Sequence, residues 1–180
     1  RVRSSAASDV YKRQVYALGE AGLLNALYDR GITMNDVNPD YVVIGEARAY
    51  SLDTLTKATN LVLAGAKLIG ANSDTCGPTD EGIAPACRAL IAPVEIATGK
   101  QAYFCGKPNP LMMRTGLRIL GCHSGEAVMI GDRRFDIEGA AAAGMESIGI
   151  LWGYGSREEL EKASPDYLAA DIPELRRILG

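Results

Sequence analysis

Residues 128–140, VMIGDRRFDIEGA, bring an apolar run to a glycine and then add two carboxylates, Asp132 and Asp136, ahead of a small-residue stretch. The run predicts a buried strand, and the small residues predict a helix that packs close to a sheet. Two like charges about 5 Å apart repel by about 3 kcal/mol at an effective dielectric constant near 20. The stretch therefore predicts an acidic strand end that a cation stabilises.

Short apolar runs alternate with helical periodicity through the rest of the chain. Strands are expected at residues 15–19, 41–45, 67–72, 101–106, 126–131, 147–151 and 166–170. Helices are expected at residues 20–31, 51–66, 83–99, 109–121, 136–144, 156–163 and 172–180, with Ser51 and Ser156 as N-caps. Residues 73–82 read as a polar loop. This alternation predicts an α/β architecture with mostly parallel sheets.

Composition excludes several classes of partner. The net charge is −3 with both signs interspersed, which argues against nucleic acid. No apolar run has the eighteen or so residues that a membrane span needs. The four cysteines are scattered without a C-x-x-C pair, so we expect reduced core thiols in a cytosolic protein. The single histidine, His123, lies in a polar turn, so a catalytic triad that depends on histidine is not expected.

The first fourteen residues, RVRSSAASDVYKRQ, differ from the rest of the chain because they have no apolar face. The end of this stretch, DVYKRQ, resembles a translated sequencing adapter, and the alternative is a genuine disordered tail. On the adapter interpretation, we expect the N-terminal part of the natural protein to be missing from this chain.

The ammonium group of Lys107 is a candidate for a cation at the acidic strand end. It follows the expected strand 101–106 in the stretch GKPNP (106–110), where the positive end of a helix would help to attract phosphate. Ligands bind beyond the carboxyl ends of strands in open parallel sheets. Mg²⁺ prefers one or two carboxylates with waters and phosphate oxygens, and a lysine stabilises a transferring phosphoryl group. We therefore predict that Lys107, Asp132 and Asp136 meet around Mg²⁺ and a phosphoryl group.

These residues also have interpretations that involve no catalysis or metal binding. A lone strand-end lysine is often solvated, and Asp136 could cap a helix without any metal. A non-enzymatic α/β domain that binds a phosphorylated ligand is the alternative function. No GxxxxGK[ST] or GxGxxG loop supports a standard nucleotide site, and GYGS (153–156) reads as a loop. The order of the two motifs, 25 residues apart from Lys107 to Asp132, favours the joint site.

These motifs resemble a known family. GKPNP, the helix after it and VMIGDRRFDI resemble motifs three and four of the haloacid dehalogenase superfamily of phosphatases. The stretches VNPDYVVIGEARAYSLDTLTKA (37–58) and GAKLIGANSDTCGPTDEGIAPACRALIAPVEIATGKQAYFCGKPNPLMMRTGL (65–117) are similar to its large-cap subfamily, the NagD-like or 4-nitrophenylphosphatase group. The resemblance implies an α/β cap at residues 15–98 and the C-terminal part of a Rossmann-like core at 99–180.

The resemblance also implies roles for the core residues. Lys107 would be the motif-three lysine, and Asp132 would ligate Mg²⁺. Asp136 would ligate the ion through water or orient its neighbours, and Asn109 would contribute to substrate binding.

In the cap, Asn72 and Asp74 match a loop that faces the substrate, with an Asx turn as the alternative. The implied partner is a small phosphorylated metabolite, and caps of this type also imply a homo-oligomer.

The chain departs from the family pattern in two ways. It contains no Asp-x-Asp, the motif whose first aspartate attacks phosphorus and whose second acts as general acid and base. We therefore expect the nucleophile to be absent from this chain and the chain to be inactive alone. The spacing in GDRRFD (131–136) and the stretch GYGSREELEKA (153–163) look more like the phosphoglycolate-phosphatase branch, as in a hybrid or a divergent protein. Without the first-motif strand, strand 126–131 should expose an edge and promote self-association.

Overall fold

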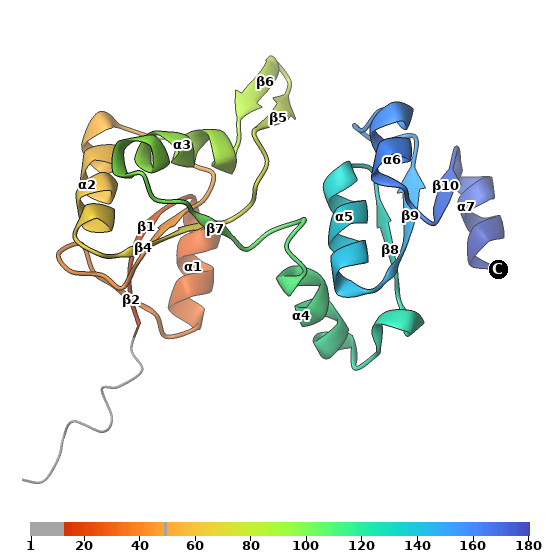
Figure 1. The fold of residues 1–180 in the computed structure, drawn as a ribbon, viewed down its shortest axis with the longest axis horizontal. Helices are drawn as coiled ribbons and strands as arrows, with labels where there is room; N and C mark the ends of the chain where they lie inside the picture. Colours follow the sequence, from red (N-terminus) through yellow and green to blue (C-terminus); the bar gives the residue numbers. More distant parts are fainter. Residues whose placement is uncertain (1–12, 49) are drawn as a thin grey trace, which may run out of the picture. The chain divides into compact units, whose positions relative to one another are not determined.

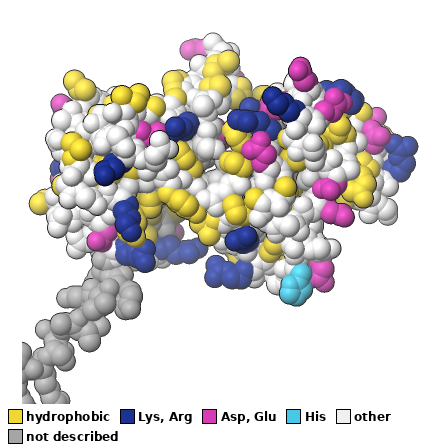
Figure 2. Space-filling view, viewed as in Figure 1, with side chains coloured by type: hydrophobic (Ala, Val, Ile, Leu, Met, Phe, Trp, Pro, Cys, Tyr) yellow, Lys and Arg dark blue, Asp and Glu magenta, His cyan; other side chains and the backbone are white. Residues whose placement is uncertain are grey.

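The structure is a computed structural model that describes residues 13–48 and 50–180. The chain divides into two compact units, Arg1–Phe104 and Cys105–Gly180, each described here by itself (Figure 1). The α/β class predicted from the sequence is confirmed, because parallel strands alternate with helices in both units. Acidic and basic side chains are interspersed over the visible face (Figure 2). Within the described ranges, no helix is long and apolar enough to cross a bilayer.

The first unit is built on a five-stranded parallel sheet with the order β2-β1-β3-β4-β7. Its strands are β1 (Gln14–Leu18), β2 (Thr33–Met34), β3 (Tyr41–Ile44), β4 (Lys67–Gly70) and β7 (Tyr103–Phe104). Its helices are α1 (Ala21–Asp29), α2 (Leu52–Leu63) and α3 (Cys87–Thr98). Helices α2 and α3 contact each other and cover one face of the sheet, and α1 lies on the other face (Figure 1).

The core of the first unit lies between this sheet and the α2/α3 layer. Its buried members come from β3, β4 and the inner faces of both helices: Val42, Ile44, Ala58, Leu61, Val62, Leu68, Ile91 and Val94. The start of α2 is fixed by the predicted N-cap, since the Ser51 side chain accepts a hydrogen bond from the Thr54 N–H at 3.1 Å. The Thr54 hydroxyl accepts in turn from the Ser51 N–H, which completes a capping box.

The predicted loop at residues 73–82 is wrong in part. An antiparallel hairpin forms there from β5 (Cys76–Thr79) and β6 (Gly82–Pro85), with a two-residue turn between them. The hairpin contains glycine and proline, which are depleted in strands, so the sequence pattern alone did not indicate these two strands. Because residues 82–85 belong to β6, helix α3 begins at Cys87 rather than at the predicted residue 83, and it continues past Pro93 to Thr98.

The boundary between the units lies after Phe104, whereas the sequence placed the change near residues 98–100. The strand expected at 101–106 is reduced to β7, which pairs with β4 of the first unit at Ile69 and Gly70. A Cβ at Gly70 would lie 2.4 Å from the Phe104 ring, so glycine permits this close packing. The division into a cap and a core stays a prediction.

The second unit has a three-stranded parallel sheet with the order β10-β9-β8. Its strands are β8 (Val128–Gly131), β9 (Glu146–Ile150) and β10 (Tyr167–Ala169). Its helices are α4 (Leu111–Leu120), a 3₁₀ turn (Ser124–Glu126), α5 (Arg134–Ala143), α6 (Arg157–Ala163) and α7 (Ile172–Leu179). Helix α5 packs on β8 and β9, and its residues Ile137 and Ala140 are buried. Gly139 faces the other way, since a Cβ there would lie 3.3 Å from Met113 Cε of α4.

Strand β8 lies at the edge of this sheet. Among the residues that the structure describes, it pairs with β9 alone, and Ile130 is 39% exposed. This arrangement is consistent with the expected open edge, and self-association of the chain stays a prediction.

Candidate functional site

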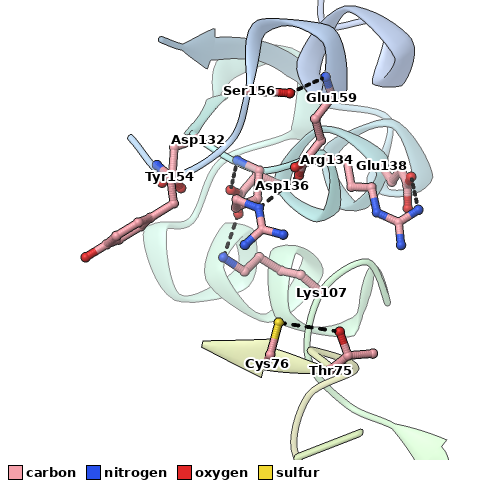
Figure 3. Close-up of polar contacts among 11 residues, drawn as sticks. Thr75, Cys76, Lys107, Asp132, Arg134, Asp136, Glu138, Tyr154, Ser156 and Glu159 are labelled. Carbon is pink, nitrogen blue, oxygen red and sulfur yellow. Dashed lines mark hydrogen bonds and ion pairs between the residues drawn. The ribbon is translucent and has the colours of Figure 1, made fainter. Parts of the chain in front are cut away.

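Lys107 and Asp136 meet at the carboxyl end of β8. The Lys107 Nζ atom lies 2.5 Å from Asp136 Oδ1 in an ion pair within the second unit (Figure 3). Lys107 comes from the loop before α4, and Asp136 lies in the first turn of α5. The lysine and one of the two predicted acids therefore converge, although they are 29 positions apart in sequence.

Asp136 is a buried carboxylate whose two oxygens are both engaged. Its side chain is 3% exposed, Oδ1 faces Lys107, and Oδ2 accepts a hydrogen bond from the Arg133 N–H at 3.1 Å. Asp136 is thus the third residue of α5 rather than its N-cap, and it bonds back to the N-cap backbone of Arg133. A Cβ at Gly131 would lie 2.2 Å from the Asp136 Cβ, so this approach requires glycine at the strand end.

Asp132 is held by the loop after β9. Its Oδ2 accepts a hydrogen bond from the Tyr154 N–H at 2.8 Å (Figure 3). A Cβ at Gly153 would lie 2.2 Å from the Asp132 Cβ, and one at Gly155 would lie 2.0 Å from the Asp132 carbonyl oxygen. The stretch GYGS is a loop as expected, but its support of Asp132 was missed. The glycines on both sides of Tyr154 were the available signal.

Glu159 is a second supporting residue that sequence reasoning missed. Its Oε1 accepts hydrogen bonds from Arg133 Nε at 2.9 Å and from the Arg134 N–H at 3.0 Å. Partial burial raises the pKa of Glu159, but these hydrogen bonds and the two arginine charges outweigh it and leave the pKa lowered. Ser156 caps α6 as predicted, through the Glu159 N–H at 3.1 Å, while the carboxylate of Glu159 faces the arginines instead of completing a capping box.

A hard divalent cation fits the chemistry of Asp132 better than that of Asp136. Asp132 Oδ1 makes no hydrogen bond in the described part of the chain, whereas both oxygens of Asp136 are engaged. No cluster of three or more histidine, cysteine or acidic side chains that could hold a metal occurs in residues 13–48 and 50–180. One carboxylate with water and phosphate oxygens is a coordination set that Mg²⁺ accepts.

Asn109 has a structural contact in the same unit. Its Oδ1 accepts a hydrogen bond from the Leu111 N–H at 3.0 Å, which satisfies a donor in the first turn of α4. Its role in substrate binding stays a prediction.

Asn72 and Asp74 lie in the first unit, after β4. Asn72 Oδ1 accepts a hydrogen bond from the Asp74 N–H at 3.1 Å, which is the Asx turn expected as the alternative. The Asn72 amide also donates to Glu46 Oε1 at 3.0 Å. A substrate-facing role for either residue stays a prediction.

The cysteines depart from the expectation of core thiols. All four are free, but only Cys87 is buried, and Cys76 is exposed in the hairpin that the sequence did not reveal. Burial raises the pKa of Cys87. His123 lies, as expected, in a turn, where its backbone N–H donates to Glu126 Oε2 at 2.8 Å.

The family model described as HAD-hydrolase-like matches residues 104–175, which span most of the second unit. Dihydroxyacetone phosphatase of Corynebacterium glutamicum (strain R) is 41% identical over 156 residues, which cover 86% of this chain and 57% of that protein. Ribonucleotide monophosphatase NagD of Escherichia coli (strain K12) is 37% identical over 177 residues, covering 94% of this chain and 70% of that protein.

Solved structures agree with the sequence comparison. The glycerol phosphate phosphatase of Mycobacterium tuberculosis, crystallised in complex with calcium, matches with a TM-score of 0.84 and 30% identity over 91% of this chain and 51% of that chain. The chain thus spans 57% and 70% of the length of the two relatives above. The identity and coverage against the Escherichia coli protein show that the chain belongs to the haloacid dehalogenase-like hydrolases, in their NagD-like group.

Proposed function

We propose that the protein is a Mg²⁺-dependent phosphatase that hydrolyses small phosphate monoesters, such as sugar phosphates, nucleotides or aryl phosphates. The observation that carries this proposal is the ion pair of Lys107 with the buried Asp136, beside Asp132 at the carboxyl end of β8. The names of the relatives support a phosphatase and also vary in substrate, so they favour a class of substrates rather than one compound. The cytoplasm is the compartment we expect, and a homo-oligomer formed through the first unit is part of the proposal.

Each residue of the site has a separate task in this proposal. Asp132 would hold Mg²⁺, which when bound supplies positive charge to the phosphate oxygens. Lys107 stabilises the negative charge of the transferring phosphoryl group, and Asp136 positions the lysine ammonium. Because Asp136 is buried and held on both oxygens, the ammonium is kept in a defined place.

The nucleophile in this proposal is an aspartate of an Asp-x-Asp motif. Its carboxylate attacks phosphorus, the alcohol leaves with a proton from the second aspartate, and water then cleaves the aspartyl-phosphate to release phosphate. The 180 residues contain no Asp-x-Asp, so the proposal requires that motif from sequence beyond them.

We expect the 180-residue chain alone to show no Mg²⁺-dependent release of 4-nitrophenol from 4-nitrophenyl phosphate above the buffer rate. The reason is that the proposed nucleophile is not among its residues. Absorbance of the released phenolate measures the result. Turnover that persists after repeated purification, and that Lys107→Met abolishes, would mean that the chain holds a different nucleophile.

Mg²⁺ should stabilise the chain through Asp132. At a free concentration about tenfold above the dissociation constant, binding to the native state alone adds about 1.4 kcal/mol of stability. Asp132→Asn should remove this gain while its amide oxygen still accepts from the Tyr154 N–H. Thermal unfolding with and without MgCl₂, at constant ionic strength, measures the effect.

Asp53→Asn is the matched control, because it makes the same charge change at an exposed position of α2 in the first unit. It should keep the full response to Mg²⁺. An Asp132→Asn chain that responds as strongly as the unaltered chain would contradict the assignment of this metal ligand.

A further inference from the structure

The segment that follows β9 holds the loop of Asp132 at two separate points, both within the second unit. At one point, the Tyr154 N–H donates to Asp132 Oδ2 at 2.8 Å (Figure 3). At the other, Glu159 Oε1 accepts hydrogen bonds from Arg133 Nε at 2.9 Å and from the Arg134 N–H at 3.0 Å. One carboxylate oxygen of α6 therefore ties down the two residues that directly follow Asp132.

Glu159 is itself fixed in place. Its N–H donates to Ser156 Oγ at 3.1 Å, and the next residue, Leu160, is fully buried where α6 packs against α5. The Glu159 side chain is 25% exposed, so water competes less for its ion pair with Arg133 than for a pair on the open surface. The packing of α6 therefore determines where this carboxylate holds the loop.

The contact with Arg134 satisfies a donor at the start of α5. Helix α5 begins at Arg134, and the first N–H groups of a helix have no partner inside that helix. Glu159 supplies the partner from another helix and places a negative charge at the positive end of α5. Its contact with Arg133 Nε restrains the preceding residue as well. Together these contacts fix the path of the backbone from Asp132 into α5.

Close packing makes the position of Asp132 sensitive to this restraint. A Cβ at Gly155 would lie 2.0 Å from the Asp132 carbonyl oxygen and 3.5 Å from Arg133 Cδ, so the two segments touch without spare room. The Tyr154 N–H binds Asp132 Oδ2, while Oδ1 makes no hydrogen bond in the part of the chain that the structure describes. A displaced backbone at residues 133–134 would therefore move the carboxylate of the proposed metal ligand.

We propose that Glu159 is a positioning residue for Mg²⁺ binding, which acts by holding the loop that carries Asp132. Glu159 does not contact the ion in this proposal; it acts through Arg133 and Arg134. Residues that orient a metal ligand from outside the coordination sphere commonly change metal affinity by about 10-fold to 100-fold. The inference rests on the proposed function, because it takes Asp132 as the ligand, and it adds a residue on which the affinity of that site depends.

Variants of Glu159 separate the reach of its side chain from its charge. Glu159→Ala removes both contacts and should weaken Mg²⁺ binding about tenfold. Glu159→Asp keeps the charge but is shorter by one methylene, so it should weaken binding by at least about fivefold. Glu159→Gln keeps an oxygen acceptor at the same reach and should stay within about twofold of the unaltered chain. Titration of the ¹⁵N-labelled full chain with MgCl₂ at constant ionic strength gives each dissociation constant from the Tyr154 amide signal.

Glu158→Ala is the matched control, because it truncates the exposed neighbouring residue of α6. It should leave the dissociation constant for Mg²⁺ unchanged. Thermal unfolding without Mg²⁺ measures how far each variant is destabilised, and titration well below every unfolding midpoint keeps that loss out of the dissociation constant. A merely structural role for Glu159 would lower the unfolding midpoint and leave Mg²⁺ affinity as it is.

The possible failures of this inference and of the proposed function differ. Equal dissociation constants for the Glu159→Asp and Glu158→Ala chains would overturn the inference and leave Asp132 as the metal ligand. Binding by Glu159→Gln as weak as that by Glu159→Ala would also overturn it, since charge rather than position would then explain the loss. A Tyr154 signal that does not respond to Mg²⁺ in the unaltered chain would overturn both the assignment of Asp132 and the role of Glu159.

Discussion

Gly155→Ala should destabilise the second unit by about 2 to 4 kcal/mol. The new Cβ would lie 2.0 Å from the carbonyl oxygen of Asp132 and 3.1 Å from its carbonyl carbon. Because the obstructing atoms are backbone, a change of side-chain rotamer cannot relieve the clash, and the loop after β8 or the loop after β9 must move. Urea unfolding followed by the fluorescence of Trp152, the only tryptophan, reports on this unit directly.

Gly125→Ala is the control for this substitution. A Cβ at Gly125 would meet no heavy atom within 4 Å, so the variant should be neutral or slightly stabilised through the unfolded chain. Gly155→Ala should also weaken the response to Mg²⁺, since the clash displaces Asp132. A Gly155→Ala chain with the same urea midpoint as the Gly125→Ala chain would show that the two loops do not meet as described.

Local patterns predicted most of the architecture. The alternating apolar runs indicated every strand of four or more residues in both parallel sheets, and Ser51 and Ser156 indicated the starts of α2 and α6. Strand β2 was not predicted because its two residues are too few for a period to show. The hairpin β5–β6 was not predicted because glycine and proline occupy positions where β-branched residues would signal a strand.

The candidate site could likewise be predicted from the sequence only in part. Lys107 and Asp136 could be paired from the sequence because each follows an expected strand, and the carboxyl ends of parallel strands share one edge. The contacts of Glu159 with Arg133 and Arg134 could not be predicted. They depend on how α6 packs against α5, which no periodicity in either segment encodes. The tight approach of Gly155 to Asp132 is another such long-range contact.

Lys107→Met should destabilise the second unit by about 1 to 3 kcal/mol. It leaves the Asp136 carboxylate, whose side chain is 3% exposed, with the Arg133 N–H as its remaining described partner. The cost stays below that of a fully buried pair, because the Lys107 side chain is 38% exposed and water can approach the vacated place. Urea midpoints measured by Trp152 fluorescence give the size of the effect.

Removing the charge of the other partner, in Asp136→Asn, should reduce the stability by less than Lys107→Met does. This difference between the two variants makes the prediction specific. In Asp136→Asn the amide oxygen can still accept a hydrogen bond, and a half-exposed lysine ammonium can be hydrated, so we expect a loss of about 1 kcal/mol. Lys162→Met, in the last turn of α6, removes an exposed lysine of the same unit and should change stability by less than about 0.5 kcal/mol. Equal losses for Lys107→Met and Lys162→Met would mean that the ion pair does not stabilise the buried carboxylate. A larger loss for Asp136→Asn than for Lys107→Met would mean that Asp136 supports α5 chiefly through Arg133, with the lysine as a lesser partner.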